Sequence, residues 1–512
     1  IPNKVLEILD TTLRDGEQTA GVSFNANEKL TIAKLLLDDI HVDRVEVASA
    51  RVSEGELAAL KSICSWAKEN GYISRVETLG FVDDGVSINW ISGAGCQVMN
   101  LLTKGSLKHV LGQLHKTPEQ HIEDIKRNVA LARERDMKVN IYLEDWSNGM
   151  LHSPEYVYQL IDALRREPIS RFMLPDTLGV LSPDLTEKFC LDMVKRYPEL
   201  KFDFHAHNDY DMAVANVYSA LKAGITGVHT TVNGLGERAG NTPLASVIGL
   251  LNDHLHIPNS LREIRLTHLC RMVESISGIR IPDNKPLVGD SVFTQCAGIH
   301  ADGDNKDNLY FNQLLPERFG RVRKYALGKT SGKASIAKNL EELGIHLTPE
   351  QIKKVTQRVI ELGDKKESMT TEDLPFIIAD VLKNGEDRHN NVHIVNYNLT
   401  LARGLKPVAS LRISIKGKEY EETSIGDGQY DAFMKALWKI YERLGRQHPV
   451  LVDYNVSIPP GGKTDALVET VILWQFNEQH IKTRGLDVDQ TEAAIKATIK
   501  MLNMVEPEFD VK

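Results

Sequence analysis

Residues 202–209 read Phe-Asp-Phe-His-Ala-His-Asn-Asp, an apolar strand pattern that ends in two histidines just before a helix is expected to begin. The same order recurs along the first half of the chain: a short β-branched run, a polar or glycine-containing end, then an amphipathic helix. The predicted strands are 5–9, 44–48, 76–79, 98–102, 139–143, 171–174, 202–205 and 227–231. The predicted helices include 27–40, 54–69, 118–135, 154–166, 183–197 and 211–223. Eight such units match a parallel (β/α)8 barrel in number and size.

An open, doubly wound sheet would show the same alternation of strand and helix patterns. Nearly every predicted strand, however, ends in a reactive or polar group. A TIM barrel with its active site at the carboxyl ends of the strands requires this arrangement. We therefore expect an α/β fold with a catalytic barrel over residues 1–260.

The composition changes twice after the barrel. Residues 261–388 are rich in His, Arg and Lys, and amphipathic patterns at 334–343 and 349–362 predict helical linker or lid subdomains. Residues 389–512 contain a duplication, because Tyr397-Asn-Leu-Thr-Leu401 is echoed by Tyr454-Asn-Val-Ser-Ile458. Each half is expected to form a βββα unit of a C-terminal α+β domain. That domain could be a stable pseudo-symmetric body only, or it could sense a small molecule.

The bulk composition of the 512 residues excludes several classes of protein. The net charge is −9, with 61 basic and 70 acidic side chains interspersed, so neither nucleic acid nor an anionic membrane is an expected partner. No apolar stretch approaches the roughly 20 residues needed to span a bilayer, and no signal peptide is visible. The five cysteines are scattered, odd in number and without a C-x-x-C pair. These features are typical of a soluble cytoplasmic enzyme with reduced thiols.

A divalent-metal site is the strongest local prediction. His205 and His207 are two residues apart on a strand, so both side chains face the same way and could bind one cation. Asp15, in the segment after the first strand, is the oxygen ligand we select, and Arg14 beside it could stabilise a developing oxyanion. Core or capping histidines and a surface turn are the plain alternatives. Two nitrogens and a carboxylate would leave room for a 2-keto acid, with Mg²⁺, Mn²⁺ and Zn²⁺ all open.

Other strand ends supply candidates for acid–base chemistry. Glu144 follows Tyr142 on the same face of a predicted strand and could act as a general base. His300, outside the barrel, is a second candidate, although it could equally be an exposed loop residue. Thr177 could donate a hydrogen bond to a substrate carboxylate. The glycines at 234–240 and 328–332 match neither a dinucleotide nor a P-loop fingerprint, so NAD and ATP are not expected.

Taken together, these segments resemble the 2-isopropylmalate, homocitrate and citramalate synthase branch of the DRE-TIM metallolyase family. The matching motifs are D-T-T-L-R-D-G-E-Q at 10–18, Glu46, H-x-H-N-D at 205–209, N-G-x-G-E-R-A-G-N at 233–241 and G-I-H-A-D-G at 298–303. The resemblance covers almost the whole chain, including the duplicated C-terminal domain. Within the branch it is greatest to bacterial (R)-citramalate synthases of the spirochaete type, through stretches at 48–55, 143–149, 174–180 and 458–465.

The resemblance implies a role for each motif residue. It implies metal ligation by Asp15, His205 and His207, with Asn241 nearby. It implies catalytic roles for Arg14, Glu46, Glu144 and His300. It implies a substrate pocket of Arg14, Leu79, Leu102, Tyr142 and Thr177. It implies acetyl-CoA contacts from Asp302, Asn308, Leu309 and Tyr310. It implies an amino-acid effector groove lined by Tyr430, Asp431, Leu451, Tyr454, Ile458 and Val468, with isoleucine as effector, and a homodimer.

The implied reaction joins acetyl-CoA to pyruvate, with hydrolysis of the thioester, in isoleucine biosynthesis. Apolar Leu79 and Leu102 would leave a second substrate carboxylate unpaired, which argues against 2-oxoglutarate. Pyruvate against 2-ketoisovalerate stays open, because a few methyl groups change binding by only about 1–3 kcal/mol. The alternative is therefore a 2-isopropylmalate synthase.

Two other classes of protein fit the sequence less well. A lyase of the hydroxymethylglutaryl-CoA type would carry a Cys in the loop at 234–240, which has none. A sensor that has lost catalysis is disfavoured by the intact Arg14, Asp15, His205 and His207.

Overall fold

The computed structural model describes residues 6–304, 306–364, 369, 371, 374–382, 391–457, 468–477 and 479–506. The chain forms two compact units, one of Ile1–Thr294 with Asn308–Lys324 and one of Gln295–Asp307 with Tyr325–Lys512. The three-domain division at 260/261 and 388/389 stays a prediction.

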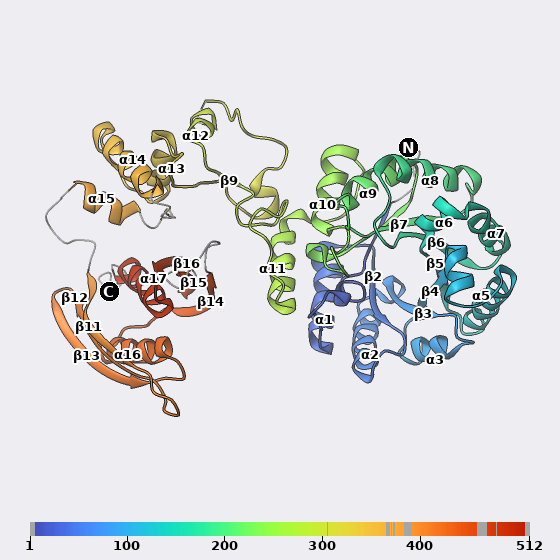
Figure 1. The fold of residues 1–512 in the computed structure, drawn as a ribbon, viewed down its shortest axis with the longest axis horizontal. Coiled ribbons are helices and arrows are strands. Elements are labelled where there is room, and N and C mark those ends of the chain that lie inside the picture. The colour runs from blue at the N-terminus through green and yellow to red at the C-terminus, as the bar shows by residue number, and fades with distance from the viewer. Residues whose placement is uncertain are drawn as a thin grey trace. The chain divides into compact units, whose positions relative to one another are not determined.

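The first unit is built on a closed barrel of eight parallel strands that are neighbours in sequence order (Figure 1). The strands are β1 Glu7–Asp10, β2 Arg44–Ser49, β3 Val76–Phe81, β4 Val98–Lys104, β5 Lys138–Glu144, β6 Ile169–Asp176, β7 Phe202–Ala206 and β8 Gly227–Thr230. β8 closes the barrel by pairing with β1. The predicted fold class is confirmed, with every predicted strand present.

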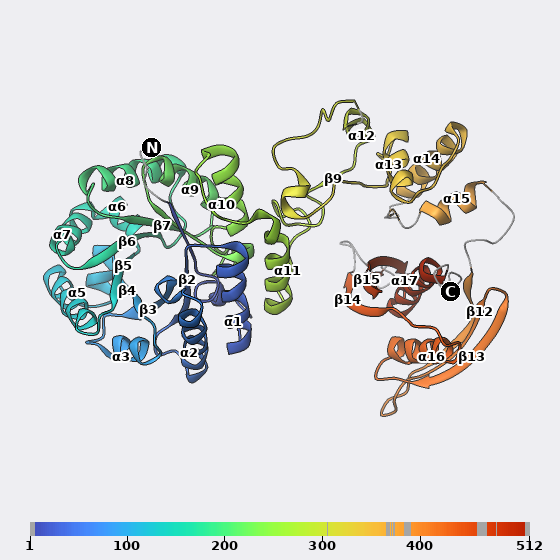
Figure 2. The same cartoon turned by 180° about the vertical axis from the view of Figure 1, so that it is seen from behind.

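Helices surround the barrel strands, as Figure 2 shows from the opposite side. They are α1 Ala26–Lys34, continued by a π turn over Leu35–Ile40, α2 Glu54–Glu69, α3 Val86–Gly93, α4 Leu107–Gly112, α5 Pro118–Arg133, α6 Trp146–His152, α7 Pro154–Leu164, α8 Pro183–Arg196, α9 Ala213–Lys222, α10 Leu244–Leu250 and α11 Leu266–Ser277. Asn25, Ser53, Thr117 and Ser182 cap the first turns of α1, α2, α5 and α8. Such caps satisfy the free amide groups of a helix start, and they fix where four of the predicted helices begin.

The barrel interior has a charged layer toward the amino ends of the strands. Arg44 contacts Glu77 at 3.0 Å and Asp203 at 2.6 Å, and Arg171 contacts Asp203 at 2.6 Å. All four side chains are buried. Buried charges are tolerated when they are paired in this way, and this layer is the charged floor of the barrel interior.

The second unit begins with short elements around a small apolar core. These are α12 Gly298–Asp304, α13 Lys333–Glu342, α14 Pro349–Asp364 and α15 Leu374–Leu382. The two-residue strands β9 Thr294–Gln295 and β10 Lys324–Tyr325 fall at the boundaries between the two units, and a 3₁₀ turn over Pro316–Phe319 belongs to the first unit. Ile336, Leu340, Val355 and Val359 are buried together. The predicted helical character of this region is confirmed.

The C-terminal part consists of two antiparallel sheets, each followed by a helix. The first has β11 Val392–Thr400, β12 Val408–Ile415, β13 Lys418–Ile425 and α16 Gln429–Arg443. The second has β14 Val450–Ser457, β15 Val468–Phe476, β16 Gln479–Asp487 and α17 Gln490–Val505. Each helix packs on its own sheet, and both halves contribute to one core that includes Phe433 and Trp474. The duplicated βββα architecture is confirmed. Among the described helices, none is long and apolar enough to cross a membrane.

Candidate active site at the carboxyl ends of the barrel strands

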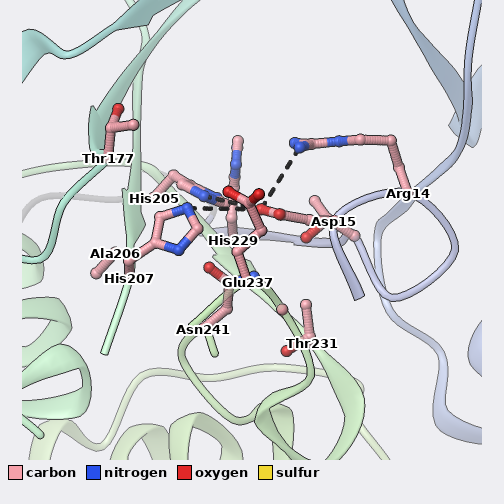
Figure 3. Close-up of polar contacts among 12 residues, drawn as sticks. Arg14, Asp15, Thr177, His205, Ala206, His207, His229, Thr231, Glu237 and Asn241 are labelled. Carbon is pink, nitrogen blue, oxygen red and sulfur yellow. Dashed lines mark ion pairs between the residues drawn. The ribbon is translucent and has the colours of Figure 1, made fainter. Parts of the chain in front are cut away.

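Asp15, His205 and His207 converge at the carboxyl end of the barrel (Figure 3). Asp15 lies just after β1, His205 lies on β7, and His207 follows it. Asp15 Oδ2 is 3.1 Å from His205 Nε2 and 3.9 Å from His207 Nε2. All three side chains are buried. Two segments far apart in sequence therefore bring one carboxylate and two imidazoles together, as the strand pattern predicts.

The chemistry of this cluster fits a divalent cation. Asp15 Oδ1, His205 Nδ1 and His207 Nδ1 are buried and have no hydrogen-bond partner within the described part of the chain. Such orphaned polar atoms are costly unless a ligand satisfies them. Asn241, in the segment between β8 and α10, pairs with His207 through the backbone and has a buried side-chain oxygen without a partner among the described residues. Among the described residues, Asp15, His205 and His207 are the one group with the geometry to hold a metal ion.

The protonation states also favour metal binding. Burial alone would raise the pKa of Asp15, but Arg14 and the two histidines outweigh it and hold that pKa below its usual value. Burial, followed by the neighbouring His205, lowers the pKa of His207 to about 3. An ionised carboxylate and a neutral imidazole are the forms that bind metals. Both groups are in those forms at neutral pH.

Arg14 is fixed beside the cluster by three partners. Its Nε donates to Glu46 Oε2 at 2.6 Å, and its Nη2 donates to the Tyr142 hydroxyl at 3.2 Å. Its Nη1 is 3.5 Å from Asp15 Oδ2. Glu46 is itself held by Asn100, whose Nδ2 donates to Glu46 Oε1 at 2.7 Å. The guanidinium is thus a preorganised cation next to the candidate metal position, which is where negative charge on an oxygen would be stabilised.

An apolar wall lies beside these polar groups. Leu79 and Tyr142 are buried in one cluster with Leu9 and Met173, and Leu102 packs against it from β4. The structure therefore brings together Leu79, Leu102 and Tyr142, three members of the substrate pocket that the resemblance implies.

Thr177 follows β6, and its hydroxyl oxygen accepts a hydrogen bond from the Asp145 backbone N–H at 2.9 Å. Because that bond uses a lone pair, the hydroxyl proton remains able to donate to an acceptor such as a carboxylate. Arg238 Nη2 donates to the Thr177 carbonyl oxygen at 2.8 Å while also pairing with Asp209. Thr177 is thereby held in place at the strand end.

Glu144 ends β5 and forms a close ion pair with Lys104 at the end of β4. The two residues are register partners across the β4–β5 pair, so the fold places them side by side. His300 lies on α12 in the second unit, where its Nδ1 is 3.1 Å from Gln295 Oε1. Asp302 shares that helix, whereas Asn308, Leu309 and Tyr310 belong to the barrel unit. Their roles toward acetyl-CoA stay predictions.

The predicted effector residues lie in the C-terminal repeats. Tyr430 on α16 and Tyr454 on β14 have ring centroids 5.6 Å apart, and the Tyr430 hydroxyl is 2.7 Å from Thr498 Oγ1. Asp431 pairs with Lys435 at 2.7 Å. Leu451 is exposed, Val468 is buried, and Ile458 lies outside the described residues. The structure thus brings Tyr430 and Tyr454 together from different repeats.

Sequence reasoning missed the residues that support the site from within the barrel. They are Asn100, Lys104, Asp203 and His229. A usable signal was present for Asp203, because it lies two residues before His205 and must face the same way on the strand.

A TIM barrel with a carboxylate–imidazole cluster and a fixed arginine at its carboxyl end defines a candidate metal-dependent barrel enzyme. The HMGL-like family matches residues 5–275, the homocitrate synthase post-HMGL domain-like family matches 287–367, and the LeuA allosteric (dimerisation) domain matches 368–506. The chain belongs to the HMGL-like family.

Three curated relatives illustrate the similarity. "Putative (R)-citramalate synthase CimA" of Methanopyrus kandleri is 35% identical over 468 residues, which cover 91% of this chain and 89% of the relative. "(R)-citramalate synthase CimA" of Methanocaldococcus jannaschii is 32% identical over 503 residues, covering 98% and 99%. "2-isopropylmalate synthase" of Methanocaldococcus jannaschii is 30% identical over 513 residues, covering 99% and 95%. The resemblance stated from the motifs is confirmed, and the relatives are synthases.

Proposed function

We propose that this chain condenses acetyl-CoA with pyruvate and, with water, releases citramalate and CoA. The observation that carries the proposal is the wall of Leu79, Leu102 and Tyr142 beside Arg14 and the Asp15–His205–His207 cluster. A short apolar keto acid matches such a pocket, since its methyl group would lie on the wall and its oxygens on the polar side. A second candidate is 2-isopropylmalate synthesis from 2-ketoisovalerate, which the name of one close relative favours.

Each residue then has a defined task. Thr177 donates to the keto-acid carboxylate, and Arg14 stabilises the negative charge that develops on the keto oxygen as the new carbon–carbon bond forms. Glu144 removes a proton from the acetyl methyl group, and Lys104 beside it orients the carboxylate. Glu46 accepts a hydrogen bond from Arg14 Nε and so fixes the orientation of the guanidinium. Asp15, His205 and His207, with Asn241 alongside, would hold a divalent ion, and that ion would supply Lewis-acid polarisation of the ketone.

Three further assignments belong to the same proposal. Asp302, Asn308, Leu309 and Tyr310 bind the thioester end of acetyl-CoA, with His300 as a second candidate base. Tyr430, Asp431, Leu451, Tyr454, Ile458 and Val468 line an effector groove that binds isoleucine and inhibits the enzyme. The match to a LeuA allosteric (dimerisation) domain supports effector control and a homodimer.

Steady-state kinetics with the two keto acids test the proposal. We expect kcat/KM for pyruvate to exceed that for 2-ketoisovalerate by about 10–200-fold, because the larger side chain must displace the apolar wall. Leu79→Ala should lower that ratio by a similar factor by opening space for two methyl groups. CoA release, followed with a thiol reagent, measures both rates.

The matched control is Leu101→Ala on the same barrel. Leu101 is buried in the main core rather than in the pocket cluster, so this variant should lose stability but keep the wild-type keto-acid ratio. A wild-type preference for 2-ketoisovalerate would replace pyruvate with the second candidate.

A further inference from the structure

A hydrogen-bonded chain runs from the pocket wall into the charged floor of the barrel. His229 on β8 is buried, with Nδ1 3.0 Å from the Tyr142 hydroxyl and Nε2 3.3 Å from Asp203 Oδ2. The Tyr142 hydroxyl also accepts from Arg14 Nη2 at 3.2 Å. A continuous path of side chains therefore joins Asp203, His229, Tyr142 and Arg14.

The donor and the acceptor in each hydrogen bond of this path follow from Asp203, the residue at its end in the charged floor. Arg44 Nη2 and Arg171 Nη1 each contact an Asp203 carboxylate oxygen at 2.6 Å, so two guanidinium groups are paired with this carboxylate. An ionised Asp203 accepts only, so His229 Nε2 must carry the proton that faces it. The buried Tyr142 hydroxyl proton needs an acceptor, and the Arg14 guanidinium has none to offer, so His229 Nδ1 presents the lone pair that receives it.

The lone pair on His229 decides what Tyr142 can do. With Nδ1 as acceptor, the Tyr142 O–H must donate to His229, and the phenol oxygen is left to accept from Arg14. The hydroxyl proton is then unavailable to any substrate oxygen. The Tyr142 ring forms part of the apolar wall, and its phenol oxygen accepts from the Arg14 guanidinium. The hydrogen bond between Tyr142 and His229 therefore fixes both the wall and the cation.

We propose that His229 is a positioning residue, which holds the Tyr142 phenol as an acceptor for Arg14 and so fixes the wall and the cation of the keto-acid pocket. Its effect on turnover rests on the proposed function, whereas the hydrogen-bond direction does not. His229 hydrogen-bonds to Tyr142, and its ring also lies edge-on to that of His205, with 5.3 Å between the ring centroids. Removing the Tyr142 phenol therefore separates the effect that passes through Tyr142 from any effect on His205.

A double-mutant cycle tests this dependence. We expect His229→Leu to lower kcat/KM for pyruvate by about 10–100-fold, because Tyr142 loses its acceptor and Arg14 its fixed partner. In a Tyr142→Phe background the same substitution should cost less than about 2-fold, since the phenol it acts through is already gone. His229→Asn should recover most of the loss, because the amide oxygen can take the place of Nδ1.

Thermal unfolding of each variant separates this role from a structural one. If His229 has only a structural role, His229→Leu should lower kcat/KM equally in the wild-type and Tyr142→Phe backgrounds, and His229→Asn should not restore it. That result would overturn the proposal.

Nuclear magnetic resonance of ¹⁵N-histidine-labelled protein tests the hydrogen-bond direction without turnover, with the His229→Leu variant assigning the signal. We expect Nε2 protonated and Nδ1 unprotonated. An Nδ1–H tautomer or a doubly protonated ring would overturn the inference even in an active enzyme. Absence of turnover with either keto acid would instead refute the proposed function, and the tautomer would still be decided.

Discussion

Asp15→Asn is expected to abolish tight binding of divalent cations and to lower kcat by about 10³-fold or more. Asp15 supplies the only anionic oxygen in the cluster with His205 and His207. An amide of the same size keeps the packing but loses the charge that attracts the cation, and several kcal/mol of transition-state stabilisation go with it. Calorimetric titration with Mn²⁺ and steady-state assays with pyruvate measure the two effects.

Asp10→Asn is the matched control for this prediction. Asp10 is also a buried aspartate of the same segment, but its carboxylate accepts from the Thr12 backbone N–H at 3.0 Å and the Thr230 hydroxyl at 3.1 Å. It is not part of the metal cluster, so its amide variant should bind Mn²⁺ with near wild-type affinity. If Asp15→Asn bound Mn²⁺ as tightly as Asp10→Asn and the wild type, Asp15 would not be a metal ligand.

Arg14→Lys should reduce kcat by about 10²–10³-fold while Mn²⁺ binding is retained. Lysine keeps the positive charge, but its single ammonium cannot donate to Glu46 and Tyr142 in the planar geometry that the guanidinium uses. A preorganised donor lost from a charged transition state typically costs a factor of this size. Steady-state kcat together with Mn²⁺ titration distinguishes this outcome from loss of the metal.

Arg51→Lys serves as its control. Arg51 is exposed and pairs with Asp83 at 2.9 Å, where a lysine can replace it. If Arg14→Lys kept a kcat within about 3-fold of Arg51→Lys, Arg14 would have no role in stabilising charge.

The parts of the molecule that sequence predicted well are those set by local patterns. His205 and His207 were predicted to face one cation because residues two apart on a strand share a face. The repeats of the C-terminal domain could be predicted for a similar reason, because each strand and helix recurs at corresponding positions of the two halves. By contrast, α3, α4 and α6 span 8, 6 and 7 residues, which is too short for a helical period to stand out.

The parts that sequence could not predict depend on pairing between distant segments. Glu46 meets Asn100 across 54 residues, and Tyr142 meets His229 across 87. The pairing of Glu144 with Lys104 follows from the register of β4 against β5, which no pattern in either strand encodes. These contacts fix the orientation of the Arg14 guanidinium, the position of Tyr142 in the apolar wall and the position of the candidate base Glu144. The sequence motifs therefore identify the functional residues, whereas the barrel fold determines their geometry.

The position of a bound metal is the most direct test of the candidate site. Crystals of the protein soaked with Mn²⁺ should give one strong anomalous peak about 2 Å from an Asp15 carboxylate oxygen and from one ring nitrogen each of His205 and His207. An anomalous peak on other side chains, or none at saturating Mn²⁺, would contradict the proposed centre and with it the proposed condensation.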